Sequence, residues 1–206
     1  MNLEHLYTAV ELVRADCTRD RHRHATFMRT YPVLLATARA PAPDATAAFL
    51  RAASLAYTWV PQRLRLEPGH LSAAVEAFET ALALSTDTAA AIAHEGIDAI
   101  AACLSSVAGA SRVLHLANPG LYPMWDEEIE TFRLNEEPTP YHMGQTRHYV
   151  DFIEGIRALS GHPLFLTFHH DYCTAYQGRL QRLRIPPYPL TEPRVVESAI
   201  RELVTD

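Results

Sequence analysis

The segment that decides the fold is AAAIAHEGIDAIAACL (89–104), followed by SSVAG (105–109), ASRVLHLA (110–117) and NPGLYPMWD (118–126). The first stretch is almost wholly apolar and predicts a helix near the centre of the protein. The small residues after it predict a turn, and the third stretch predicts a second, short helix. Two prolines and a glycine then break any helix and deliver Asp126 to the start of the next one.

The turn and the loop together predict a binding site. At the start of the second helix, the backbone N–H groups from Val107 to Ser111 lack partners within the helix, and such groups suit a phosphate or a carboxylate. Gly109 lets an anion come close to the backbone. Asp126 either caps the helix that follows or faces a cleft, and one residue can do both.

The combination of ASRVLHLA, Asn118-Pro119 and Tyr122-Pro123-Met124-Trp125-Asp126 resembles a known motif. It is similar to the helix-hairpin-helix, Gly/Pro-rich loop and Asp of the base-excision DNA glycosylase superfamily, which includes the 8-oxoguanine glycosylases. The resemblance covers residues 88–129. It implies that the hairpin binds DNA phosphate and that Asp126 supports cleavage of the glycosidic bond. The phosphate-binding residues that it implies are Val107, Ala108, Gly109 and Ala110, with Arg112 as a charge partner.

Four aromatic residues are candidates for a base pocket, because enzymes that act on an extruded base hold it between aromatic faces. They are Tyr57, Trp59, Tyr122 and Trp125. For Tyr57 and Trp59, which end a predicted helix beside Pro61, packing in the core is the competing and commoner role.

Two departures from the superfamily pattern limit what the resemblance implies. The usual Leu-Pro-Gly-Val-Gly hairpin is replaced by LSSVAG at residues 104–109, which predicts a looser hold on phosphate. All 18 Lys and Arg residues are arginines. Because a guanidinium stays protonated, it cannot form the Schiff base of the bifunctional glycosylases, so a lysine-dependent lyase is excluded.

Composition predicts a single helical domain over residues 1–206, with the breaker at 40–44 as a candidate boundary between two small lobes around a cleft. About nine or ten helices are expected from the breaker-bounded segments. One of these helices begins after Asp44 as its N-cap and continues to Trp59, and another covers 127–134.

The expected location is the cytoplasm, without a membrane span or signal peptide, since no apolar run of about 18 residues exists. The three cysteines, Cys17, Cys103 and Cys173, lie far apart in the sequence, which fits reduced thiols. We expect neither a metal nor another cofactor.

The net charge of −6 argues against broad, nonspecific binding of nucleic acid, because neutralised phosphates supply much of that affinity. The negative charge is concentrated in residues 126–137, which contain six acidic residues and one basic residue, Arg133. Any bound DNA backbone must therefore avoid that face.

The function expected from the resemblance is that of a monofunctional DNA glycosylase-like protein, whose partner is DNA or a nucleoside or nucleotide. One alternative is a noncatalytic module that binds a protein or a nucleotide, which the acidic balance and the altered hairpin favour. A hydrolase of free nucleosides or nucleotides is a third, because it needs the carboxylate and a pocket but no surface that follows DNA.

Overall fold

The computed structural model describes residues 1–15, 21–59, 63–85 and 94–204. Over these residues the chain forms α-helices and two short 3-10 helices and no strand, so the predicted all-α class is confirmed. The elements are α1 (Leu3–Ala15), α2 (Arg21–Ala38), α3 (Ala45–Ala56), η1 (Tyr57–Trp59), η2 (Pro68–His70), α4 (Leu71–Ala83), α5 (His94–Leu104), α6 (Val107–Ala117), α7 (Glu127–Leu134), α8 (Pro140–Met143), α9 (Thr146–Ser160), α10 (Phe165–Arg182) and α11 (Glu192–Val204).

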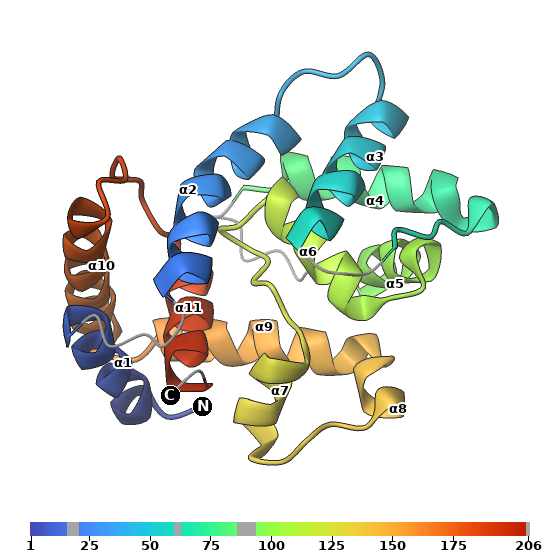
Figure 1. Cartoon of the computed structure of the whole chain (residues 1–206). Helices are drawn as coiled ribbons and strands as arrows, with labels where there is room; N and C mark the ends of the chain where they lie inside the picture. Colours follow the sequence, from blue (N-terminus) through green and yellow to red (C-terminus); the bar gives the residue numbers. More distant parts are fainter. Residues whose placement is uncertain (16–20, 60–62, 86–93, 205–206) are drawn as a thin grey trace.

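The helices pack in two groups that share a boundary (Figure 1). Helices α1, α10 and α11 pack on one another, so both ends of the chain lie in the same group. Helices α3, α4, α5 and α6 form the other group. Helix α2 packs on α3 and α6 of the second group. Helix α9 contacts α5 and α6 as well as α10 and α11, so it connects the two groups.

The buried apolar side chains form a continuous cluster that extends from α1 to α11. Its largest fully buried members include Trp125, Tyr149, Phe49 and Phe78. Trp125 belongs to the loop between α6 and α7, so this loop is anchored in the core by its own aromatic residue.

The central segment differs from the prediction at the start of its second helix, while the predicted start of the first helix, at Ala89, lies outside the described residues. Helix α6 begins at Val107 rather than Ala110, because Ser106 is extended and its Oγ accepts a hydrogen bond from the N–H of Gly109. A serine N-cap thus starts the helix within the small-residue stretch expected to be a turn. Helices α5 and α6 are bent by 120° at this break.

Two other predicted starts agree with the structure. Asp44 caps α3 through the N–H of Ala47, and α7 covers the predicted residues 127–134. Within the described part of the chain, no single helix has the length and apolarity needed to cross a membrane. The bent pair of Gly96–Leu104 and Val107–Ala117 meets that test only when its two halves are taken together.

Candidate functional site

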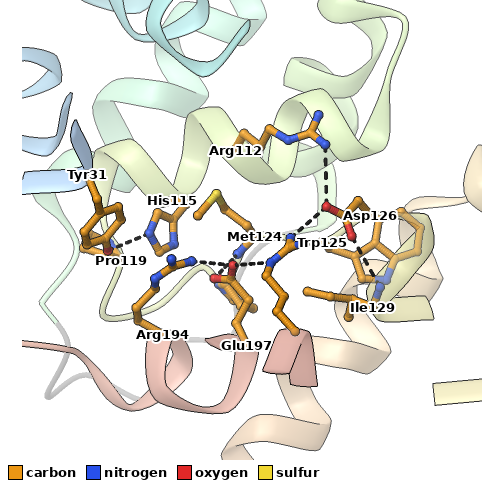
Figure 2. A network of polar contacts seen from close by, with 12 residues as sticks. Tyr31, Arg112, His115, Pro119, Met124, Trp125, Asp126, Ile129, Arg194 and Glu197 are labelled. Atoms are coloured by element: carbon orange, nitrogen blue, oxygen red, sulfur yellow. Dashed lines mark hydrogen bonds and ion pairs between the residues drawn. The ribbon is translucent and has the colours of Figure 1, made fainter. Parts of the chain in front are cut away.

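Asp126 occupies the N-cap of α7, where its Oδ1 accepts a hydrogen bond of 3.3 Å from the N–H of Ile129. This confirms the capping role predicted for it. Its other oxygen, Oδ2, lies 2.7 Å from the guanidinium of Arg201 on α11 and 3.7 Å from that of Arg112 on α6 (Figure 2). About 18% of the Asp126 side chain remains exposed.

The two arginines keep Asp126 ionised. Burial alone raises the pKa of this carboxyl, but the charge and hydrogen bond of Arg201 and the charge of Arg112 outweigh burial and hold the pKa below its usual value. A carboxylate of low pKa is a weak general base. Asp126 is better suited to stabilising a positive charge that develops nearby than to removing a proton.

Arg201 is held in place by a second carboxylate, that of Glu197, one turn earlier on α11. Glu197 is fully buried, and its Oε1 accepts hydrogen bonds from Arg194 and, at 3.2 Å, from Nε of Arg201. Its Oε2 accepts a hydrogen bond of 3.2 Å from the N–H of Met124. Glu197 therefore joins α11 to the loop that presents Asp126 (Figure 2).

The network continues away from Asp126 through aromatic residues. The guanidinium of Arg194 lies 4.6 Å from the ring centre of Tyr31, whose hydroxyl is 2.9 Å from Nε2 of His115. Nδ1 of His115 lies 2.8 Å from the carbonyl oxygen of Tyr122 and donates to it, so Nε2 is the acceptor from Tyr31. Burial lowers the pKa of His115 to about 4, and this histidine is neutral at pH 7.

The start of α6 brings predicted phosphate-binding and base-pocket residues together. A Cβ at Gly109 would lie 2.5 Å from the hydroxyl of Tyr57, so Tyr57 fills the space in front of this glycine. Burial raises the pKa of the Tyr57 hydroxyl, while a hydrogen bond with Ser106 and the charge of Arg112 lower it by less. Tyr57, Gly109, Arg112 and Asp126 thus belong to one region of the protein.

The predicted N–H groups are only partly available to a ligand. Gly109 donates to Ser106 Oγ and Ala110 donates to the carbonyl of Ser106, at 2.9 and 3.0 Å. Helix geometry leaves Val107 and Ala108 as the two positions whose N–H groups have no acceptor within α6.

The remaining aromatic candidates do not line an open pocket. Tyr122 and Trp125 are 4% and 0% exposed, and both belong to the core. The indole N–H of Trp125 donates to Oε2 of Glu130 at 2.9 Å. The side chain of Trp59 lies outside the described residues. Stacking a base on Tyr122 or Trp125 therefore requires the loop to move.

A surface hollow of about 500 Å³ lies at the other end of α6. It is lined by Arg39, Leu82, Leu84, Ser85, Ala117 and Asn118. Arg39 donates to the carbonyls of Leu116 and Ala117, so its guanidinium caps the C-terminus of α6. Asp126 is not among the lining residues, and the hollow adds nothing to the chemistry of that carboxylate.

Sequence reasoning missed the α11 charges that organise this site. Arg194, Glu197 and Arg201 are spaced i, i+3 and i+7, which places them on one face of a helix. That spacing was a usable signal for an ion-paired stripe. It gives no indication that the stripe is buried against the loop before Asp126.

Comparison of the chain with protein-family models, with curated proteins and with solved structures finds no match.

Proposed function

We propose that the protein hydrolyses an N-glycosidic bond in the manner of a monofunctional DNA glycosylase, with Asp126 as the carboxylate that stabilises the positive charge developing on the sugar. The observation that carries this proposal is the state of Asp126, which is ionised, partly exposed and fixed at a helix N-terminus between two guanidinium groups. The absence of lysine from the sequence restricts the reaction to one without a lysine Schiff base.

The arginines also give the proposal a means of holding substrate. Arg112 and Arg201 have side chains that are 14% and 26% exposed, so a phosphate on either side of the scissile sugar can reach them from solvent. Arg201 must release part of its contact with Asp126 when the sugar approaches. Glu197 keeps Arg201 nearby during that exchange, since it binds the guanidinium through Nε.

The experiment is base release from duplexes that contain modified or normal bases, and from free nucleosides. Wild type is compared with Asp126→Asn, which removes the charge but preserves the N-cap because Asn caps helices as well as Asp does. Asp44→Asn is the matched control, since Asp44 caps α3 in the same way and bears no relation to this site. We expect a loss of about 100-fold in Asp126→Asn and no loss in the control.

Circular dichroism and thermal melts establish that all three proteins are folded. Equal release by wild type and Asp126→Asn would remove Asp126 from the reaction. Absence of release from every substrate by the folded wild type would refute the hydrolase.

The second candidate is a noncatalytic module that binds a nucleotide or a protein. It is favoured by the contacts of Asp126, because both of its oxygens are engaged, and by the burial of Tyr122 and Trp125. A DNA affinity that falls steeply as salt is added would support DNA as the partner. If the protein shows no such affinity, the noncatalytic module is favoured. For both candidates we propose a cytoplasmic location, because the three cysteines lie far apart in the sequence, as reduced thiols commonly do.

A further inference from the structure

A second cluster of chemically active side chains lies where α7, α8 and the start of α9 meet. Glu130, His142 and His148 come from these three helices, and one ligand atom of each lies within 4.8 Å of the others. One carboxylate and two imidazoles form a donor set that zinc and other divalent transition metals accept. Glu130 is on the same helix that Asp126 caps, but its carboxylate contacts α8 rather than Arg201.

The two carboxylate oxygens of Glu130 have different partners: Oε2 contacts Trp125 and Arg133, and Oε1 contacts His142. Its side chain is 1% exposed, and burial raises its pKa, but hydrogen bonds from His142 and Trp125 and the charge of Arg133 bring the pKa below the usual value. Oε2 accepts from Trp125 at 2.9 Å and from Arg133 at 2.6 Å. Oε1 lies 2.7 Å from Nε2 of His142. A metal ion could take the place of the hydrogen-bonded proton between these two atoms.

The rings of His142 and His148 lie face to face. Their centres are 3.5 Å apart and their planes are inclined by 7°. Two imidazolium ions repel at this distance, so at least one ring is neutral. Burial, and then the proximity of His142, lower the pKa of His148. Neutral imidazole is the form that binds a metal.

Contacts around His148 select its tautomer. Nδ1 lies 3.7 Å from Oδ2 of Asp151, while Nε2 accepts a hydrogen bond of 3.3 Å from Nε of Arg147. The proton is thus on Nδ1 and the lone pair on Nε2. A carboxylate behind the protonated nitrogen is the usual arrangement that orients a metal-binding histidine.

We propose that Glu130, His142 and His148 bind a divalent transition-metal ion of the zinc class through Oε1 of the carboxylate and one nitrogen of each imidazole. Water completes the coordination, because the side chains of His142 and His148 are 20% and 19% exposed. The ion displaces the proton shared by Glu130 and His142 into solvent. This site is separate from the proposed glycosidic chemistry.

Binding requires a small local rearrangement. Ligand atoms about 2.1 Å from a tetrahedral ion are about 3.4 Å apart, so the three groups must close from their present spread of up to 4.8 Å. Parallel rings also point their lone pairs side by side rather than at one point. Both histidine rings therefore rotate, the stack opens, and Arg147 gives up its hydrogen bond to Nε2 of His148 when the ion binds.

The surrounding charges permit a cation. The charges of Arg133 and Arg147 are balanced by Glu130 and Asp151 within the cluster. The segment 126–137 has six acidic residues against one arginine, and two of them, Asp126 and Glu128, are paired with Arg201.

The test is isothermal titration of the full chain with Zn²⁺, together with the visible absorption of added Co²⁺ as a report of coordination geometry. His148→Gln and His142→Gln remove one ligand each, and His170→Gln replaces an exposed histidine of α10 as the matched control. Wild type and the control are expected to bind one ion at this site, with proton release seen as heats that depend on the buffer. Each ligand variant is expected to bind about 100-fold more weakly or worse.

Zn²⁺ affinity that is the same in wild type, His142→Gln and His148→Gln would overturn the proposal, as would the absence of saturable binding to the folded wild type. Two ligand variants are used so that a folding defect in one leaves the other informative. Glu130 is not substituted, because its contacts with Trp125 and Arg133 also support the fold.

Discussion

His115 is expected to make the protein less stable in mildly acidic solution. Its ring is fully buried between Tyr31 and the carbonyl of Tyr122, and burial lowers its pKa to about 4. In the unfolded chain the same ring has a pKa of about 6.5. The unfolded state therefore binds more protons between these two values, and the stability falls as the pH decreases through this window.

The magnitude follows from the two pKa values. Between pH 7.5 and pH 5, His115 alone removes about 2 kcal/mol from the free energy of unfolding. The carboxyl groups of Asp126, Glu130 and Glu197 have pKa values below their usual range, so their contribution is lost at lower pH, as the carboxyls of the unfolded chain become protonated.

The assay is urea unfolding at pH 7.5 and pH 5 for wild type and His115→Gln. The variant is expected to lose about 2 kcal/mol less than wild type over this interval, whatever its stability at pH 7.5. An NMR titration of the His115 ring in folded wild type reports the pKa directly. A ring that titrates near pH 6.5, or the same pH dependence in both proteins, would refute the argument.

Three further predictions test contacts that support the fold and the site. Ser106→Ala removes the N-cap of α6 and is expected to lower the free energy of unfolding by about 1 kcal/mol, measured by urea unfolding, with no change if Ser106 Oγ makes no contribution. Glu202→Leu removes a buried partner of Arg179 and is expected to lower the free energy of unfolding by about 3–5 kcal/mol. Adding Arg179→Met to this variant is expected to recover much of the loss. A double variant as unstable as Glu202→Leu would contradict this prediction. Trp125→Phe deletes the indole N–H that binds Glu130 and is expected to lower the thermal midpoint through a loss of about 2 kcal/mol, and an unchanged midpoint would show that the hydrogen bond is dispensable.

The central helix pair illustrates how local sequence predicts an element but misplaces its start. Ser106 and the small residues after it were predicted to form a turn, and both Ser caps and turns use the same residue types. Helix α6 begins three residues earlier than predicted because Ser106 is fixed as an extended N-cap. Asp44 was correctly predicted as a cap, and capping was one of the two roles predicted for Asp126, since each precedes an unbroken helical pattern.

The site illustrates the opposite case. Asp126 was identified from the loop before it, and Arg112 from its position on α6, and the structure brings both together. Arg201 and Glu197 are distant in sequence from Asp126 and belong to α11, at the other end of the chain from the loop that they contact. Local patterns carry no information about which charged stripe will face the loop.

The sequence by itself determined that the protein is helical, that Asp44 caps a helix, that a helix covers 127–134, and that no lysine is available for covalent chemistry, because periodicity, capping and composition are local properties. Only the tertiary structure decided that Glu197 is buried beside Met124, that Tyr57 covers Gly109 and that Glu130 meets two stacked histidines. These contacts join segments far apart in the chain. They depend on how the helices pack, because packing determines which side chains are buried and which charged groups lie next to one another.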